Sequence, residues 1–532
     1  MSKKNVFPLS AAFAACLLLI CGSLVLPAKA WEVARTAEKS GVLATSVGYS
    51  AAALAPEADV TIAARVTLKA PEMLPAPERL PVSVALVIDH SGSMGDAKKM
   101  DYAKRAAKTL IRSLAPEDML AIVIYDDTVK ALFPLQKVSD KDKLIKLVEA
   151  VEPGGRTFLS GGLEAGIKQL AGVRREGPCR VILLSDGLAN VGVTRPDAVA
   201  AIGAKARKSG IGVSSIGLGL DFHEDMMQRL AQSGGGQYYY IEDSEYLPSV
   251  FKQELALTVE SFTRNLRCAF ISSGAARGVK VYGYESVSKD NTTDIDISDL
   301  SAGEERQIML RLTVKPEKMS GLQKIGNLQL SYTDRQSGEE RQISLPMQLE
   351  VLAEEPARRE AEERNAAALK AVREEVALLD ADEAQVEAMG ELHKGNKEKA
   401  KAILQKQQES LALAAPGNKT VAGKMEQLKE VEANLEQASQ DAALRNQMTK
   451  ASKSTAYMSA KGQKQGIMLR KGDTGYMVEK LQNTLQKNGA YAGKADGVYS
   501  AEVEDAVKSF QKSQSMDADG VAGPATMKAL GL

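Results

Sequence analysis

Short apolar runs alternate with amphipathic stretches over residues 81–262. The amphipathic stretches have a helical period; in 97–114 the apolar residues fall on one face. The apolar runs have the length of strands and predict buried strands at 82–88, 119–125, 129–133, 180–185, 211–218 and 237–241. Strands that alternate with helices predict a mostly parallel sheet covered on both faces, which is a doubly wound, Rossmann-like α/β domain.

On both sides of this region the period changes from helical to alternating. One strand is predicted upstream, at 60–68, and downstream strands are predicted at 265–272, 279–285, 305–315, 325–333 and 341–352. Because the upstream strand is alone, we expect it to join the downstream strands. The sequence therefore predicts one β-sandwich into which the α/β domain is inserted.

The last third of the chain loses its aromatic residues and becomes rich in Ala, Glu, Lys, Gln and Leu over 353–450. This composition predicts long helices, broken near Gly395 and at Pro416-Gly417. The stretch 388–411 fits two alternatives equally: a helical hairpin packed on its neighbours, or a charged, solvated spacer. A stretch rich in Lys, Ser, Gly and Gln at 451–466 predicts a flexible linker.

Residues 467–532 predict a small unit of three helices with two Asp-Gly turns, at 496–497 and 519–520. The chain is 532 residues long, which is more than one core usually supports, so several domains are expected. The predicted boundaries are 1–30, 31–80, 81–262, 263–352, 353–450, 451–466 and 467–532.

The first thirty residues have the three parts of a secretory signal peptide: Lys3 and Lys4, an apolar stretch at 11–26, and small residues around Lys29 before Trp31. We therefore expect export to the periplasm or cell envelope and a mature chain that begins at Trp31. An uncleaved anchor or a lipoprotein are the alternatives. The apolar run is short for a membrane span, and no later run approaches that length, so no membrane span is expected in the mature protein.

Charge and cysteine content remove some classes of function. The 68 basic and 68 acidic residues balance, which gives no reason to expect a nucleic-acid partner. After removal of the signal peptide two cysteines remain, Cys179 and Cys268. Both lie at predicted core strands, so we favour two separately buried thiols over a disulfide. These cysteines and the three histidines of the chain form no zinc-ligand pattern.

Oxygen-bearing side chains lie in three of the predicted loops of the α/β domain. Asp89, Ser91 and Ser93 come at the end of the first strand, Thr157 follows a glycine pair before a helix, and Asp186 follows the fourth strand. Carboxyl ends of parallel strands meet at one edge of a sheet, where ligands bind. Two carboxylates and three hydroxyls suit a hard cation, which we expect to be Mg²⁺, with Mn²⁺ or Ca²⁺ as alternatives.

The same residues also fit a purely structural role or a catalytic role. The serines can cap the following helix, and Asp186 can start a turn. Asp89, His90 and Ser91 suggest a hydrolase, but neighbours on a strand point to opposite faces, so His90 is badly placed to serve Ser91. A phosphatase with an aspartyl nucleophile would need a second aspartate where Ser91 stands. We expect binding and no catalytic residues.

This pattern resembles the von Willebrand factor type A domain and its metal-ion-dependent adhesion site. The resemblance implies that the ion is coordinated, directly or through water, and that an acidic side chain of a partner protein completes its shell. The flanking strands resemble the architecture of inter-alpha-trypsin inhibitor heavy chains and of bacterial proteins called calcium-activated chloride-channel-like. The implied ligands are Asp89, Ser91, Ser93, Thr157 and Asp186.

The motifs of the last segment resemble the peptidoglycan-binding domain that accompanies many cell-wall hydrolases. They are carried by Leu469, Gly472-Asp473-Thr474-Gly475, Val478, Leu481-Gln482, Leu485, Gly489, Asp496-Gly497, Ala506-Val507, Phe510-Gln511, Asp519-Gly520-Val521, Gly523-Pro524, Thr526 and Leu530. We expect exposed polar groups around a groove, namely Gln511, Asp519 and Thr526, to contact the glycan. A protein-interaction bundle unrelated to glycan is the alternative.

Three functions follow in order of preference. The first is a non-enzymatic envelope protein that holds peptidoglycan through its last segment and captures an acidic partner protein through the metal site. The second is an accessory subunit of a secretion, assembly or stress machine, in which the metal is structural. The third is a wall-modifying enzyme, for which the sequence offers no catalytic group.

Overall fold

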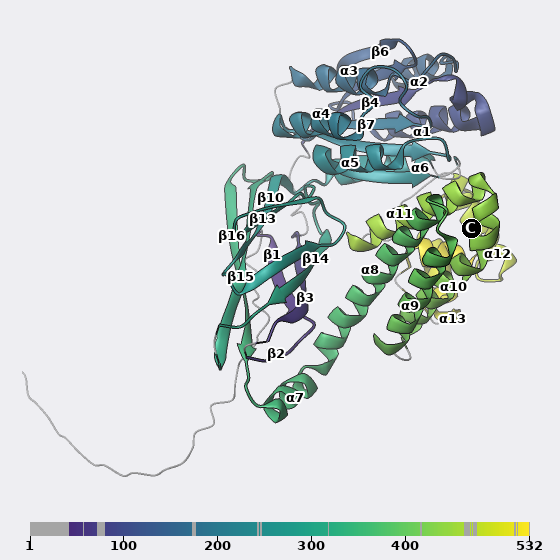
Figure 1. The fold of residues 1–532 in the computed structure, drawn as a ribbon. Coiled ribbons are helices and arrows are strands. Elements are labelled where there is room, and N and C mark those ends of the chain that lie inside the picture. Colours follow the sequence, from purple (N-terminus) through teal and green to yellow (C-terminus); the bar gives the residue numbers. More distant parts are fainter. Residues whose placement is uncertain are drawn as a thin grey trace, which may run out of the picture. The chain divides into compact units, whose positions relative to one another are not determined.

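The structure of this chain is a computed structural model, shown in Figure 1. It describes residues 42–530 except 57, 72–79, 173–176, 242–243, 245–246, 318, 415–417, 462–468, 470, 472–475, 515, 517 and 519. The predicted signal peptide at 1–30 lies outside the described residues.

A six-stranded sheet forms the centre of the α/β domain, in the order β6-β5-β4-β7-β8-β9. All neighbouring pairs are parallel except β5 with β6. The strands agree with the prediction to within a few residues and are β4 (Ser83–Asp89), β5 (Met119–Tyr125), β6 (Val129–Lys137), β7 (Cys179–Ser185), β8 (Ile211–Leu218) and β9 (Gly235–Ile241). The doubly wound fold is confirmed.

Helices cover both faces of this sheet (Figure 1). Alternate residues of β4 divide between two cores, so that Leu86 packs into one and Val87 into the other. The first core includes α1 (Lys99–Ser113), α2 (Lys141–Glu149) and α6 (Leu247–Val259). The second includes α3 (Leu159–Ala171), α4 (Pro196–Lys208) and α5 (Glu224–Gly234).

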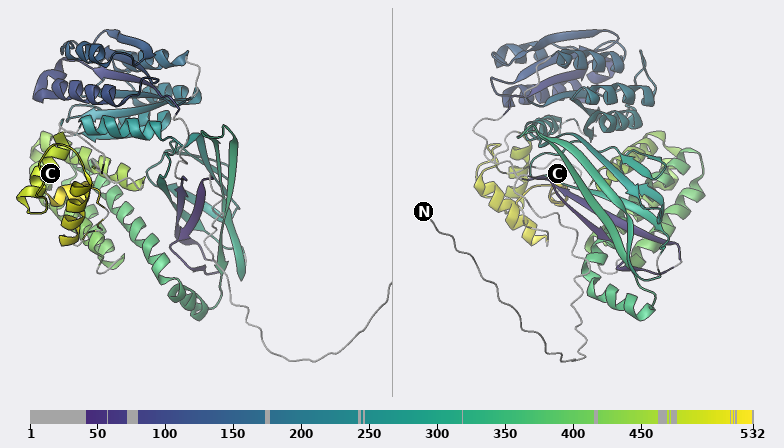
Figure 2. Two further views of the ribbon diagram at one scale, coloured as in Figure 1. Left: turned by 180° about the vertical axis from the view of Figure 1, so that it is seen from behind. Right: turned by 90° about the vertical axis from the view of Figure 1, so that its left-hand side faces the viewer.

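Two further sheets form the β-sandwich around one core, with orders β1-β3-β14-β11 and β12-β13-β10-β15-β16-β2. The upstream strand β3 pairs with the downstream strand β14 along its whole length, for example Val66 opposite Ile308, so the insertion is confirmed. In Figure 2 the purple upstream strands lie among the teal and green downstream ones. The bounds are β1 (Ala44–Tyr49), β2 (Ala53–Leu54), β3 (Val60–Lys69), β10 (Thr263–Ser272), β11 (Ala276–Val281), β12 (Ser286–Lys289), β13 (Thr292–Ile295), β14 (Glu305–Val314), β15 (Gly321–Asp334) and β16 (Glu340–Val351).

The expectation that the upstream strand stands alone is wrong. Strand β1 pairs antiparallel with β3 and alternates buried and half-buried residues. Its sequence, Ala-Thr-Ser-Val-Gly-Tyr, carries a serine and a glycine that have low strand propensity, so pairing with β3 decides its structure. Cys179 and Cys268 are both buried and are not joined in a disulfide, as favoured.

The helical region is a packed bundle. Helices α8 (Ala366–His393) and α9 (Lys397–Ala414) are joined by a turn in which Gly395 has φ +81°. Leu392, Leu404 and Leu428 belong to one buried core with both helices and α10 (Lys419–Gln440), so the structure agrees with the packed hairpin and not with the solvated spacer. The remaining helices of the region are α7 (Glu355–Arg364) and α11 (Ala442–Ala460). Among the described residues, no helix combines the length and apolarity needed to cross a membrane.

The predicted flexible linker at 451–466 is wrong for its first ten residues, because α11 continues through Ala460. Lys450, Lys453 and Tyr457 recur at a helical spacing, and each packs against the α/β domain. The Nζ of Lys450 donates to Glu224 at 2.7 Å and that of Lys453 to the same carboxylate at 2.9 Å. The ring of Tyr457 meets that of Tyr238 edge to face at 5.5 Å. The low-complexity composition of this stretch predicted a linker and gave no sign that one face of a helix here contacts the α/β domain.

The last segment contains α12 (Tyr476–Lys487), α13 (Ala501–Ser513) and α14 (Pro524–Ala529), the three helices predicted. Their apolar residues meet in one small core that includes Leu481, Val507 and Met527.

The attachment of α11 to the α/β domain should weaken at low pH. Burial alone would raise the pKa of Glu224, but the hydrogen bonds from Lys450 and Lys453 lower it from 4.5 to about 2. A carboxyl group whose pKa falls on folding stabilises the fold above its unfolded pKa, and this contribution is lost as the pH falls. We expect the thermal unfolding midpoint of the wild type to fall between pH 4.5 and 2 more steeply than that of Glu224→Gln.

Glu164→Gln, at an exposed position of α3, is the matched control and should keep the wild-type pH profile. Superimposable profiles for wild type and Glu224→Gln would show that these ion pairs do not fix α11.

Candidate metal centre

The predicted site residues lie in loops at the carboxyl edge of the α/β sheet. Asp89 is the last residue of β4, and Asp186 follows the last residue of β7. These strands are neighbours, with Ile88 opposite Leu184, so the sheet itself brings the two carboxylates together. Both carboxylates are completely buried. Burial of two like charges is costly unless other groups compensate for it.

Each oxygen of Asp89 has a hydrogen-bond donor. The backbone N–H of Ser91 donates to Oδ1 at 2.9 Å, and the hydroxyl of Ser185 donates to Oδ2 at 2.7 Å. Burial, together with the smaller effect of the nearby charge of Asp186, raises the pKa of Asp89 to about 6 despite the opposing effect of these hydrogen bonds. A cation at this position would favour the ionised carboxylate, so proton release is expected to accompany cation binding.

Each oxygen of Asp186 also has a donor. The hydroxyl of Ser93 donates to Oδ1 at 2.8 Å, and the ammonium group of Lys99 donates to Oδ2 at 2.8 Å. The hydroxyl oxygens of Ser91 and Ser93 are 3.3 Å apart. Four of the predicted residues, Asp89, Ser91, Ser93 and Asp186, are therefore linked in one chain of hydrogen bonds that passes through the two serines.

Thr157 is brought to the same place by the loop before α3. A Cβ added to Gly187 would lie 3.2 Å from Oγ1 of Thr157 and 3.5 Å from Oγ of Ser93. Both hydroxyls thus face the space beside the Gly187 backbone. The backbone of Thr157 is held by Asn190, whose side-chain oxygen accepts from its N–H at 2.9 Å. All five predicted residues are buried or half-buried in one cluster.

Backbone hydrogen bonds hold the loops together. The N–H of Gly92 donates to the carbonyl of Gly155 at 3.1 Å, and the N–H of Gly154 donates to that of His90 at 2.7 Å. Gly155 has φ +74°, and a Cβ there would lie 2.5 Å from the Asp127 carboxylate. The glycine pair before Thr157 therefore permits both the turn and the close approach of the loop.

The residues fit a hard cation. The cluster offers two carboxylates and three hydroxyls, all oxygen donors, around a space that a single added methyl group at Gly187 would enter. Ligands of this kind suit Mg²⁺, Mn²⁺ or Ca²⁺. Asp89 and Asp186 would supply the charge, and the hydroxyls of Ser91, Ser93 and Thr157 the neutral ligands.

Sequence reasoning missed three contributors to this cluster: Lys99, Ser185 and Gly187. Lys99 lies four residues before Ala103, on the buried face of α1, and a lysine on an apolar helix face was the available signal. Ser185 and Gly187 flank Asp186, where the short Ser-Asp-Gly string looked like an ordinary turn.

The contacts of His90 do not support the hydrolase alternative. Its Nδ1 lies 3.1 Å from the carbonyl oxygen of Glu152, and its Nε2 lies 3.8 Å from the carboxylate of Asp126. The hydroxyl of Ser91 instead lies beside that of Ser93. Neighbouring residues at the end of β4 thus point in different directions, as the strand geometry predicts.

The predicted glycan contacts in the last segment need correction. Gln511 and Thr526 are buried, so their predicted exposure is wrong, and Asp519 lies outside the described residues. The side chain of Gln511 accepts from Gly520 N–H at 2.9 Å and donates to the carbonyl of Val521 at 2.9 Å and to Thr526 Oγ1 at 3.1 Å. These groups hold the turn.

The first Asp-Gly turn is held in the same way. Gln482 accepts from the N–H of Gly497 at 2.8 Å and donates to the carbonyl of Val498 at 3.0 Å. Gly497 and Gly520 have φ of +72° and +73°. The segment therefore contains two similar glutamine clamps, each a buried helix glutamine that bonds the backbone of a Gly-Val pair.

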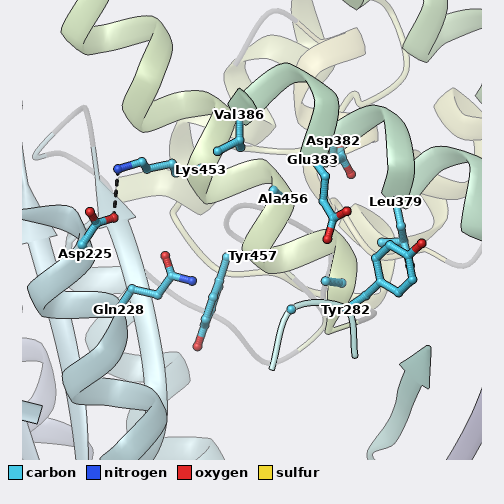
Figure 3. Close-up of a pocket in the computed structure, with 12 residues that line it drawn as sticks. Asp225, Gln228, Tyr282, Leu379, Asp382, Glu383, Val386, Lys453, Ala456 and Tyr457 are labelled. Carbon is cyan, nitrogen blue, oxygen red and sulfur yellow. Dashed lines mark hydrogen bonds and ion pairs between the residues drawn. The ribbon is translucent and has the colours of Figure 1, made fainter. Parts of the chain in front are cut away.

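A cavity of about 230 Å³ lies between α5, α8, α11 and the turn at Tyr282 (Figure 3). Its charged side chains already have partners: Asp225 with Lys453 at 2.9 Å, Asp382 with Lys424 at 2.6 Å, and Glu383 with Lys280. These ion pairs belong to the packing of α8 and α11.

Comparison with known families identifies two domains in the chain. Residues 83–253 match the von Willebrand factor type A domain, and residues 474–530 match the family described as "Putative peptidoglycan binding domain". The chain therefore contains a von Willebrand factor type A domain and a peptidoglycan-binding domain, as the motifs predicted.

Three relatives each match a part of the chain. YfbK of Escherichia coli is 28% identical over 245 residues, 45% of this chain and 43% of YfbK. Human inter-alpha-trypsin inhibitor heavy chain H3 is 28% identical over 186 residues, 33% of this chain and 21% of its own. The N-acetylmuramoyl-L-alanine amidase CwlL of Bacillus licheniformis is 42% identical over 81 residues, 15% of this chain and 22% of CwlL. The chain spans less than half the length of each.

A solved structure extends the fold comparison beyond the type A domain. The von Willebrand factor type A protein from Catenulispora acidiphila superimposes with a TM-score of 0.54 at 18% identity. The match covers 75% of this chain and 91% of that one, so the likeness includes more than the type A domain.

Gly187→Ala tests the space beside Thr157 and Ser93. Gly187 does not have a positive φ, so alanine should cause no backbone strain, but its methyl group would crowd both hydroxyls. We expect Mg²⁺ affinity, measured by calorimetry, to fall by about tenfold, equivalent to ~1.4 kcal/mol, within the usual cost of overpacking. Gly172→Ala, which points into open space, is the control and should bind like wild type.

Gln511→Met tests the glutamine clamp. Loss of the amide leaves the N–H of Gly520 and the carbonyl of Val521 without this partner, so local opening of α13 should become easier by about 2 kcal/mol. Hydrogen exchange of the α13 amides in the full chain measures this change. The exposed neighbour Gln514→Met should leave exchange unaltered. Equal exchange in both variants would refute the clamp.

Proposed function

We propose that this is an exported, non-enzymatic protein of the bacterial cell envelope. Its peptidoglycan-binding domain attaches it to the wall, and its type A domain binds a divalent cation and, through it, an acidic side chain of a partner protein. The two activities reside in separate domains of one chain.

The observation that carries the proposal is the cluster at the carboxyl edge of the α/β sheet. Two buried carboxylates and three hydroxyls converge there from loops held by backbone hydrogen bonds. With Asp89 and Asp186 as its acidic ligands, a dication keeps enough positive character to attract a further carboxylate. Oxygen ligands favour Mg²⁺.

Export is supported by the sequence of the first thirty residues, in which basic residues, an apolar stretch and a small-residue site follow one another. The envelope is also where a peptidoglycan-binding domain meets its ligand. A periplasmic location fits both the export signal and the peptidoglycan-binding domain.

The absence of enzymatic activity is part of the proposal. The three histidines have unrelated surroundings: His90 faces Glu152 and Asp126, His223 accepts from Met226 N–H, and His393 contacts Thr449. The amidase CwlL is similar to this chain over only 22% of its own length. We infer that the two proteins share a binding module.

A second candidate is a scaffold subunit of an envelope machine in which the cation is structural. It is favoured by the complete burial of Asp89 and Asp186, which places the charges away from solvent. Removal of the ion would then lower the thermal unfolding midpoint but leave partner capture unchanged.

Asp89→Asn tests the proposed function. We expect the variant to lose Mg²⁺ binding and the Mg²⁺-dependent recovery of partner proteins from envelope extracts, because one of the two anionic ligands is gone. Sedimentation with purified sacculi should remain as in wild type, since that property belongs to the other domain. Calorimetry, affinity capture with Mg²⁺ or EDTA, and co-sedimentation measure the three properties.

Asp127→Asn is the control, since it removes one exposed carboxylate from the same edge of the sheet. It should behave like wild type in all three assays. Partner recovery that is the same with Mg²⁺, with EDTA and with Asp89→Asn would contradict the adhesion site. If sacculus binding is unchanged in every condition and the wild type releases wall fragments, the protein is instead an enzyme.

A further inference from the structure

Lys99 is the cationic neighbour of the proposed metal ligands. Its side chain is 9% exposed, and its Nζ lies 2.8 Å from Oδ2 of Asp186. The other carboxylate near Nζ, that of Asp221, lies at 4.0 Å and is 75% exposed. The main partner of this lysine is therefore a buried carboxylate whose other oxygen faces Ser93.

The fold makes a specific place for this side chain. The chain leaves the 3-10 turn Gly92–Lys98 through two non-glycine residues with left-handed backbone, Ala97 at φ 48° and Lys98 at φ 57°, before α1 begins at Lys99. Such conformations are unfavourable for residues with a Cβ. They direct the chain so that Lys99 enters the buried face of α1.

Space for the ammonium group comes from the end of β8. Gly219 has φ +73°, and a Cβ there would lie 3.3 Å from Cε and 3.6 Å from Nζ of Lys99. The position thus combines a strained approach, a glycine directly after the end of β8 and a buried ion pair. An exposed lysine that reached Asp186 by chance would need none of these.

The ion pair changes the charge of the site. Asp89 and Asp186 alone carry two negative charges, and Lys99 reduces their sum to one. A bound dication would then leave one net positive charge in a water-poor pocket, where charges interact strongly. Without Lys99 the loaded site would be neutral and would attract a carboxylate less.

We propose that Lys99 is the charge-setting residue of the metal site: it weakens the hold on the dication and in return keeps the loaded site positive, so that it recruits a carboxylate. This inference rests on the proposed function of the same cluster. Lys99 acts through Asp186 and is a positioning residue, not a ligand.

The test is the sign of a change in affinity. A residue that merely supports the fold would weaken cation binding when it is replaced. A charge-setting residue should do the opposite, so Lys99→Met should bind Mg²⁺ and Mn²⁺ at least about tenfold more tightly, since a nearby repulsive charge is removed. Calorimetry on the full chain with each metal alone gives the affinities, and circular dichroism verifies that the variant is folded.

Two variants complete the experiment. Lys98→Met removes the same charge from the adjacent, exposed position and should bind Mg²⁺ within about twofold of wild type, because exposed charges are screened. Lys99→Arg keeps the charge in another shape. Wild-type affinity in Lys99→Arg supports the charge-setting role, whereas weakened binding indicates that the shape of the lysine positions Asp186.

The outcomes separate this inference from the proposed function. Weaker or equal Mg²⁺ binding by folded Lys99→Met overturns the inference while the metal site stands. If wild type binds no Mg²⁺ and Lys99→Met does, the lysine is itself the cation of the site, and both the metal-dependent function and the inference fail, because wild type then has no loaded site. If neither binds, both fail.

Discussion

The α/β domain has to hold two carboxylates side by side in a buried place. Asp89 is the last residue of β4, Asp186 directly follows the neighbouring strand β7, and both are shielded from solvent. Two unscreened negative charges would oppose this arrangement, because their repulsion and desolvation both disfavour the folded state. The loop hydrogen bonds, the serine hydroxyls and the ammonium group of Lys99 are all positioned where they reduce that cost. A dication at the same position would complete the compensation.

Much of this could be predicted from the sequence, since the apolar period, the strand ends and the glycine pair are local signals. These signals located β4, β7 and the five oxygen-bearing residues of the site. Lys99 escaped notice because its role depends on a left-handed turn and on Gly219, which lies 120 positions away in sequence and supplies only empty space. Strand β1 was missed for a similar reason: its partner strand, and not its own composition, makes it a strand.

The two glutamine clamps show how a motif can identify a fold without identifying a ligand site. Gln482 and Gln511 occupy equivalent places on α12 and α13, and each satisfies the N–H and carbonyl groups of a turn. From sequence alone, a polar residue at such a position looks available for a ligand. Burial reverses the interpretation, because a buried amide with its hydrogen bonds formed has little capacity left for a glycan. The same reasoning directs attention to exposed residues of the domain.

The loop between β8 and α5 links the metal site with the helical region. On one side, the carboxylate of Asp221 lies 4.0 Å from Nζ of Lys99. On the other, the carbonyl of Phe222 accepts from Lys450 of α11 at 2.6 Å, and the lysine lies 4.1 Å from the centre of the Phe222 ring. Lys450 is nearly buried, so its loss would leave the Phe222 carbonyl without this donor and Glu224 with Lys453 as its remaining lysine partner. The helix that precedes the peptidoglycan-binding domain in sequence is thus fastened to the loop beside Lys99 by charge and aromatic contacts.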